Sequence, residues 1–60
     1  MKLAQSNTLT GITKLISQYF YSNVVLVPTD ETHFIISNSK GTIYGFEVAI
    51  IKGRYIFREV

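Results

Sequence analysis

The clearest cluster of side chains that could act as acids, bases or metal ligands consists of Asp30, Glu31 and His33. A divalent metal ion needs several protein ligands in a fixed geometry. Adjacent residues such as Asp30 and Glu31 diverge, and His33 points to one face of its strand. We therefore expect a solvated turn followed by a histidine at a sheet margin, with no metal ion and no cofactor.

Nucleophilic catalysis needs a hydroxyl or thiol beside a base that a third group orients. The chain contains no cysteine, and His33 is its single imidazole. The nearby hydroxyls belong to Thr29, Thr32, Ser37 and Ser39. The four glycines are scattered, so there is no glycine-rich phosphate loop. We expect a protein that is not an enzyme and has no catalytic residues.

Basic and aromatic residues alternate in the last third of the chain and suggest an alternative function. The cations are Lys40, Lys52, Arg54 and Arg58, and the aromatic residues are Tyr44, Phe46, Tyr55 and Phe57. This combination can neutralise and stack single-stranded nucleic acid. The net charge is only +2, which is weak evidence for such a partner. A nucleic-acid-binding module that uses the basic C-terminal hairpin is the alternative prediction.

The composition predicts one small folded domain, residues 1–60. Hydrophobic residues make up 47% of the chain and charged residues 17%. A chain of this length buries only about 60% of the surface that its unfolded form exposes. Without cysteines to form disulfides, oligomerisation is the remaining way to stabilise the fold. No stretch approaches the ~18 consecutive apolar residues of a membrane span, so we expect a soluble, cytoplasmic protein without a membrane partner.

An amphipathic helix is predicted over residues 8–21. Its apolar residues recur at helical spacing and are Leu9, Ile12, Leu15, Ile16, Tyr19 and Phe20. Asn7 or Thr8 can cap the first turn, whereas Gly11 costs about 1 kcal/mol relative to alanine.

Four β-branched and aromatic runs follow and predict strands at 24–27, 32–37, 42–51 and 54–60. Residues 28–31 and 38–41 suit four-residue loops, and Lys52-Gly53 suits a two-residue hairpin turn. Strands joined by such short turns form an antiparallel meander. The predicted fold class is α+β, with one N-terminal helix packed on a four-stranded meander.

The Lys52-Gly53 turn sets the register of the predicted sheet. It places Ile51 opposite Arg54 next to the turn and Phe46 opposite Glu59 at the far end of the hairpin. The pairs between them include Ala49 opposite Ile56 and Glu47 opposite Arg58. The preceding loops pair Ile36 with Ile43, Phe34 with Gly45 and Thr32 with Glu47. The first hairpin pairs Val27 with Thr32 and Val25 with Phe34.

Paired residues share a face, so this register predicts two largely apolar sheet faces. The first carries Val24, Leu26, His33, Ile35, Tyr44, Phe46, Val48, Ile50, Tyr55, Phe57 and Glu59. The second carries Val25, Val27, Thr32, Phe34, Ile36, Ile43, Gly45, Glu47, Ala49, Ile51, Arg54, Ile56, Arg58 and Val60. We expect the helix to cover the first face, whose central rows are bulky, although the small Gly45 and Ala49 favour the reverse.

The second face should then bind a partner, since one helix covers only one face. The predicted interface residues are Phe34, Ile36, Ile43, Ile51, Ile56 and Val60, with a Glu47–Arg58 ion pair near them. A second copy of the chain is the expected partner, and another protein is the alternative. We also expect an accessory role of the kind that small phage-type antagonist proteins have.

The segment Thr42 to Val48, followed by Lys52-Gly53-Arg54-Tyr55, resembles the hairpin of PepSY domains, which are small inhibitory modules. The order of helix and hairpins is also similar to part of the cystatin fold. The resemblance implies an inhibitor-like protein and assigns no site residue, because the chain has no cystatin-type protease-binding loop. The predicted function is therefore a small non-enzymatic binding module or inhibitor-like protein that acts through an apolar sheet face as a homodimer.

Overall fold

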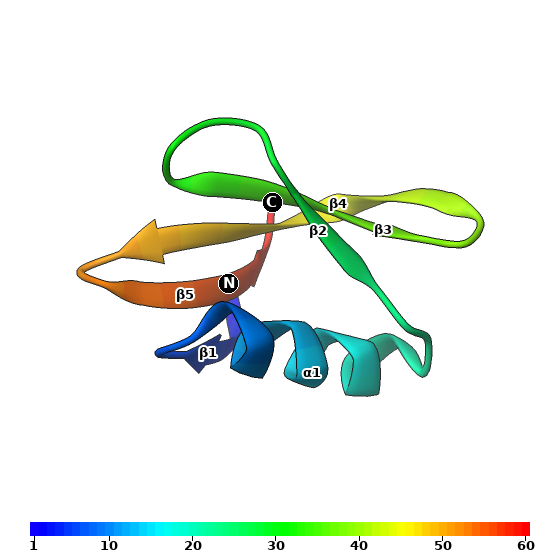
Figure 1. Cartoon of the computed structure of the whole chain (residues 1–60), viewed down its shortest axis with the longest axis horizontal. Helices are drawn as coiled ribbons and strands as arrows, with labels where there is room; N and C mark the ends of the chain where they lie inside the picture. Colours follow the sequence, from blue (N-terminus) through cyan, green and yellow to red (C-terminus); the bar gives the residue numbers. More distant parts are fainter.

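A computed structural model describes residues 1–60 and shows one helix and one five-stranded antiparallel sheet (Figure 1). The elements are β1 (Lys2–Ser6), α1 (Leu9–Phe20), β2 (Val25–Pro28), β3 (His33–Asn38), β4 (Gly41–Ile51) and β5 (Arg54–Glu59). The α+β class and the antiparallel sheet are confirmed. The prediction of four strands is wrong, because a fifth strand, β1, precedes the helix.

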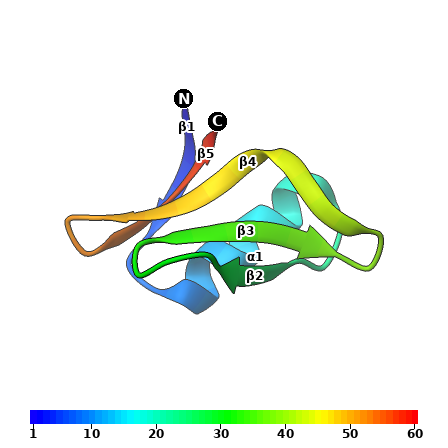
Figure 2. The ribbon, with the colours of Figure 1, turned by 90° about the horizontal axis from the view of Figure 1, so that it is seen from above.

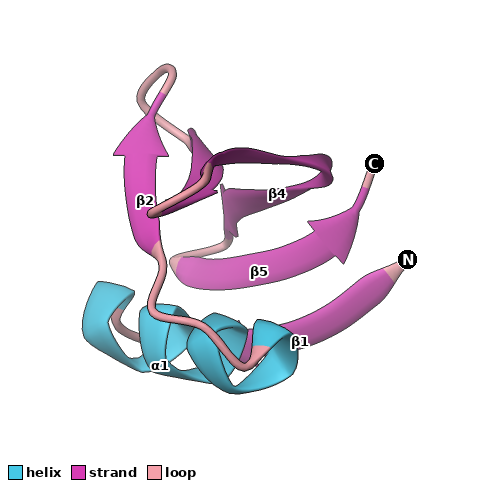
Figure 3. Ribbon diagram, turned by 90° about the vertical axis from the view of Figure 1, so that its right-hand side faces the viewer, coloured by secondary structure: helices cyan, strands magenta, loops and turns pink.

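Strand β1 lies at one edge of the sheet and β2 at the other, in the order β1-β5-β4-β3-β2. The four predicted strands are consecutive neighbours and so form the expected meander. β1 pairs with β5 from Lys2 opposite Arg58 to Ser6 opposite Tyr55, with a register shift between Lys2 and Ala4. Figure 3 shows β1 and β2 at opposite margins of the molecule, and both chain ends beside β5.

Helix α1 begins and ends within one residue of the predicted bounds. The Gly11 N–H donates to Thr8 Oγ1 at 3.0 Å, so Thr8 is the N-terminal cap. Beyond the last turn, Tyr21 takes a left-handed conformation with φ 53°. The N–H groups of Tyr21 and Ser22 then donate to the carbonyls of Gln18 and Ser17. This Schellman-type ending turns the chain back toward the sheet without a glycine.

The β4–β5 hairpin has the predicted turn and register. Lys52 and Gly53 both have positive φ, 53° and 76°, as a type I′ turn requires. All predicted pairs from Ile51 opposite Arg54 to Phe46 opposite Glu59 are confirmed. The faces of β5 and of β4 from Phe46 to Ile51 are therefore correctly assigned from the sequence.

The β3–β4 pairing departs from the prediction after its first pairs. Ile36 does lie opposite Ile43, but Phe34 lies opposite Val48 and not opposite Gly45. Between these two pairs β3 advances by two residues and β4 by five (36 − 34 and 48 − 43), so β4 carries three extra residues in a wide bulge around Gly45. The predicted Phe34–Gly45 and Thr32–Glu47 pairs are therefore wrong, and because the number of extra residues is odd, the bulge exchanges the faces of β3 relative to β4.

The β2–β3 pairing is also shifted from the prediction. Val27 lies opposite Ile35 and Val25 opposite Ser37, where the sequence predicted Thr32 and Phe34. The strand continues past Pro28, since the Thr29 N–H donates to the His33 carbonyl at 2.9 Å. The intervening loop is consequently Asp30 to Thr32, one residue shorter than the predicted loop.

The helix covers the face of β4 and β5 that carries Val48 and Phe57, which confirms the predicted choice of face. The buried core consists of Ile12, Ile16, Val24, Ile36, Val48 and Phe57. Phe34 and Ile43 pack against this core from the same side. The prediction that Phe34, Ile36 and Ile43 lie on the uncovered face is therefore wrong, and Ile36 is completely buried.

Candidate functional site

The uncovered side of the sheet, here called the outer face, is the main candidate site. On β4 and β5 the paired residues Ala49 and Ile56, and Glu47 and Arg58, belong to it. His33 lies opposite Ala49 and so places alternate residues of β3 on the same face. Ile35 follows two residues later, opposite Val27 of β2.

One end of the outer face is apolar and exposed. Val25, Val27 and Ile35 are 63%, 40% and 36% exposed, and together they form what we call the β2–β3 patch. No charged residue lies between Lys14 and Asp30, so no charge borders this patch along β2. An uncharged aliphatic surface at a sheet margin is suited to contact with another protein.

The other end of the outer face is charged. Arg58 Nε donates to Glu47 Oε2 at 2.7 Å, and both side chains are partly buried. On β1, which pairs with β5, Lys2 Nζ donates to Gln5 Oε1 at 2.9 Å. The exposed Arg54 adds a further cation beside Ile51. The expected Glu47–Arg58 ion pair is therefore present.

The predicted interface residues are divided by the structure. Ile51 and Ile56 lie on the outer face, Ile51 being exposed and Ile56 partly buried. Val60 is exposed at the chain end, where its N–H donates to the Gly45 carbonyl. The other three lie in or against the core, as described above. The sequence reasoning missed the β2–β3 patch as a site, although the uncharged Val24–Val27 run followed by a proline is a signal of an edge strand.

The four cations of the nucleic-acid alternative do not meet. Lys40 lies in the β3–β4 turn, whereas Lys52 and Arg54 lie at the β4–β5 turn, and Figure 2 shows these turns at opposite ends of the molecule. Arg58 is engaged by Glu47.

The aromatic residues of the same alternative are mostly enclosed. Phe57 is completely buried, and its ring centroid lies 5.7 Å from that of Phe46. Phe20 of α1 packs edge-on against Phe46 with centroids 5.1 Å apart. Tyr44 is exposed but stands alone, so no stacking platform lies on the surface.

The Asp30–His33 cluster forms a turn held by its own side chains. Asp30 Oδ1 accepts the Thr32 N–H at 2.8 Å and lies 3.0 Å from His33 Nδ1. The Thr32 hydroxyl lies 2.9 Å from the same ring nitrogen. The Thr32 backbone N–H, followed by the His33 ring, holds the pKa of the Asp30 carboxyl below its usual value. Each of these contacts lies within the loop, and the single histidine and the carboxylates of the chain form no group of three that could hold a metal ion.

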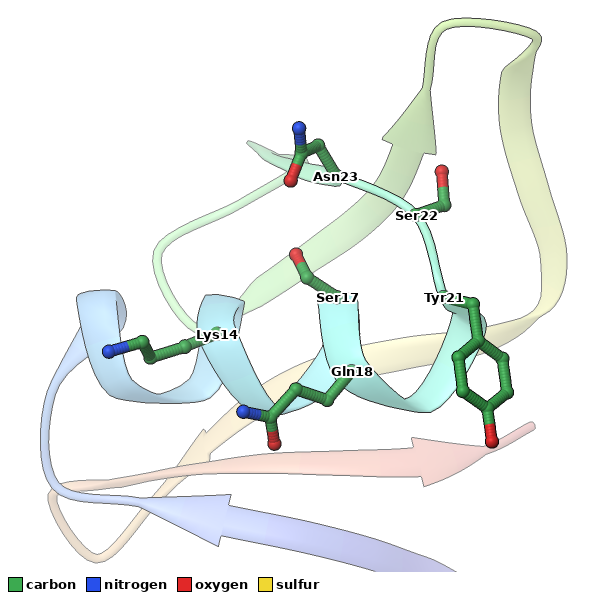
Figure 4. Close-up of a pocket in the computed structure, with 6 residues that line it drawn as sticks. All are labelled: Lys14, Ser17, Gln18, Tyr21, Ser22 and Asn23. Carbon is green, nitrogen blue, oxygen red and sulfur yellow. The ribbon is translucent and has the colours of Figure 1, made fainter.

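A shallow depression lies beside the C-terminal half of α1, lined by Lys14, Ser17, Gln18, Tyr21, Ser22 and Asn23 (Figure 4). Its side chains diverge, because Gln18 and Tyr21 point away from Ser22 and Asn23. Ser17 Oγ already accepts the Val24 N–H at 3.3 Å. The depression therefore offers no convergent set of polar groups to a ligand.

Comparisons with protein-family models, curated proteins and solved structures found no match. The similarity of the β4–β5 hairpin to PepSY domains thus assigns no family. Helix α1 is neither long nor apolar enough to cross a membrane.

Proposed function

We propose that this protein is a non-enzymatic protein-binding module that acts as a homodimer through the outer face of its sheet. The observation that carries this proposal is the β2–β3 patch, three adjacent aliphatic side chains that remain 36–63% exposed on a folded chain. Exposed single aliphatic residues are normal, but a contiguous uncharged group at a sheet margin is typical of a contact surface.

The energetics favour a weak association. Burying the exposed part of each Val or Ile side chain contributes about 1 kcal/mol, so three residues on each of two copies contribute roughly 6 kcal/mol. Association itself costs at least about 4 kcal/mol in lost translational and rotational freedom. The patch alone therefore leaves about 2 kcal/mol, less than the ~4 kcal/mol of a dimer with a millimolar dissociation constant. A dimer that forms below about 1 mM must draw on further contacts beside the patch.

The competing functions receive less support from the geometry. Lys40 lies at the opposite end of β4 from Lys52 and Arg54, and most of the aromatic rings pack beneath α1. The fourth cation, Arg58, is paired with Glu47.

The single histidine meets the Asp30 carboxylate and the Thr32 hydroxyl at the same ring nitrogen, Nδ1. A catalytic triad instead needs the carboxylate and the nucleophile on different ring nitrogens. Protein binding is the function that uses the surface left uncovered by the helix.

Sedimentation equilibrium between about 10 µM and 1 mM tests this proposal, because this range covers dimers that the patch and its further contacts together stabilise by about 4–7 kcal/mol. We expect the wild-type chain to pass from monomer to dimer and Val27→Asp to remain monomeric. Leu15→Asp is the matched control, because Leu15 on α1 is 39% exposed, close to the 40% of Val27, and lies on the helix side. A wild-type chain that stays monomeric, or a Leu15→Asp variant that alone loses the dimer, would contradict the proposal.

A further inference from the structure

The two edges of the sheet are protected to different degrees. Edge strands expose unpaired backbone groups, and proteins usually guard them with charges, irregular pairing or a covering element. The β1 edge has all three, since it carries Lys2, shifts register between Lys2 and Ala4, and packs against α1. Strand β2 carries no charge and pairs regularly with β3 along its whole length, so its only protection is its length of four residues and Pro28. Figure 3 shows β2 at the margin of the sheet opposite β1.

The backbone of β2 presents one complete donor and acceptor pair to this open edge. Thr29 donates to the His33 carbonyl, so Thr29, Val27 and Val25 direct their backbone groups toward β3. Leu26, between the two valines, must direct its N–H and C=O away from β3. Pro28 has no N–H, which is tolerated because its position also faces outward.

We infer that β2 is the dimerisation strand, and that it pairs antiparallel with β2 of a second copy about a two-fold axis beside Leu26. This inference rests on the proposed function and specifies where the second copy binds. At the axis, Leu26 and the partner's Leu26 exchange both hydrogen bonds, which is the closed pair that antiparallel strands form. Because the contact is the same on both copies, it is satisfied by two chains and does not propagate.

The side chains agree with this axis. In the same register Val25 lies opposite the partner's Val27, and Val27 opposite the partner's Val25, on the outer face. These are non-hydrogen-bonded pairs, whose side chains approach most closely. The two β2–β3 patches thereby lie side by side in a ten-stranded sheet, and Val25, the most exposed residue of the patch, contacts the partner's Val27. Ile35 on β3 gains no contact from this pairing.

The length of the strand limits both the affinity and the register. A standard interface buries at least about 600 Å² per partner, which is about one seventh of the 4139 Å² surface of this chain. A four-residue edge strand cannot supply that area alone, so we expect a weak dimer with a dissociation constant in the micromolar range or higher. Pro28 ends the pairing, because beyond Leu26 it has no N–H to offer the partner.

Cysteine cross-linking tests the register directly, since the wild-type chain has no cysteine. Non-hydrogen-bonded antiparallel pairs have Cα atoms about 4.5 Å apart, within the range that a disulfide bridges. We propose to mix Val25→Cys with Val27→Cys under mild oxidation and to compare each variant alone. Ile51→Cys is the control, because Ile51 is about as exposed as Val27, at 42% against 40%, but lies on β4. Circular dichroism and thermal unfolding check that each variant remains folded.

We expect the mixture to form a covalent heterodimer about tenfold faster than any single variant forms a homodimer, because only the 25–27 pair has bridging geometry. If the wild-type chain dimerises but the Val25→Cys and Val27→Cys mixture cross-links no faster than either variant alone, the β2 pairing is overturned and the proposed homodimer still stands. The same holds if Ile51→Cys cross-links as fast as the mixture. The latter result would indicate face-to-face packing. A chain that stays monomeric at about 1 mM, the upper end of weak association, would overturn the proposed function and the β2 pairing together.

Discussion

Arg58 and Glu47 join β5 to β4 by a hydrogen-bonded ion pair, with Arg58 Nε donating to Glu47 Oε2 at 2.7 Å. The two residues are directly opposite in register, so their side chains share the outer face. Both are partly exposed, and solvent therefore screens much of their attraction.

We predict that Glu47→Gln lowers the free energy of unfolding by at most about 1 kcal/mol, because a partly exposed ion pair contributes little. The difference should shrink in high salt, which screens exposed charges. Urea unfolding at low and high salt measures both effects. Glu59→Gln is the control, since the exposed Glu59 carboxylate makes no ion pair. An unchanged loss in high salt would show that the pair is better shielded than its exposure indicates.

The β4–β5 turn should be sensitive to substitution of Gly53. Its φ of 76° disfavours a β-branched residue, and an added Cβ would meet no atom within 4 Å. Gly53→Val should therefore destabilise by about 1–2 kcal/mol through the backbone alone. Gly53→Asn should cost less, because asparagine tolerates the left-handed region. Equal denaturation midpoints for the two variants would show that the turn takes another conformation.

The elements that local patterns specify were predictable from the sequence. The helix follows from the spacing of Ile12 and Ile16, which are both buried, and from its Thr8 cap. The β4–β5 register follows from positive-φ residues at one turn. In these cases the signal and the structure that it specifies lie within a few residues of each other.

The features that depend on distant contacts were not predictable. Strand β1 has only Leu3 as a large apolar residue, and its extended state comes from pairing with β5, about fifty residues away. The bulge around Gly45 is favoured because it brings Phe34 and Ile36 to the helix side of the sheet, where they join the core. The sequence of β4 alone does not indicate this burial. One misjudged bulge moved three residues from the core to the predicted interface and concealed the β2–β3 patch.

The Asp30 turn should make stability depend on acid pH. Thr32 and His33 hold the pKa of Asp30 below the ordinary value of 3.8. Because the folded pKa is the lower one, the carboxylate contributes stability above the unfolded value, and this contribution is lost as the pH falls through the folded pKa.

We therefore predict that Asp30→Asn is less stable than wild type near neutral pH, and that the difference disappears in strong acid. Thermal unfolding from about pH 6 down to about pH 2 spans this window. Glu31→Gln, in the same exposed loop, is the matched control because its carboxylate makes no ion pair. A constant difference between Asp30→Asn and wild type would show that hydrogen bonding by the neutral side chain, and not charge, holds the turn.

Gly11 should reverse the usual effect of replacing glycine in a helix. Glycine to alanine normally stabilises a helix by about 1 kcal/mol. Here a methyl group would collide with Ser6 Oγ and lie 2.9 Å from Thr8 Oγ1. Those oxygens accept the N–H groups of Thr8 and Gly11, so the methyl group would disturb the N-terminal cap. Since a cap contributes about 1 kcal/mol, we expect Gly11→Ala to be neutral or destabilising.

The double variant Ser6→Ala with Gly11→Ala separates the steric effect from helix propensity. It removes Ser6 Oγ, the atom that the new methyl group would meet first, and leaves the Ser6 Cβ position at 3.3 Å. We expect the double variant to be more stable than the sum of the two single changes, with a coupling of about 1 kcal/mol, as adjacent residues commonly show. Chemical denaturation of the four proteins in the cycle measures it. Additive effects, with Gly11→Ala more stable than wild type, would show that α1 moves away from β1 at little cost and that the close approach at Gly11 is not needed to position the helix.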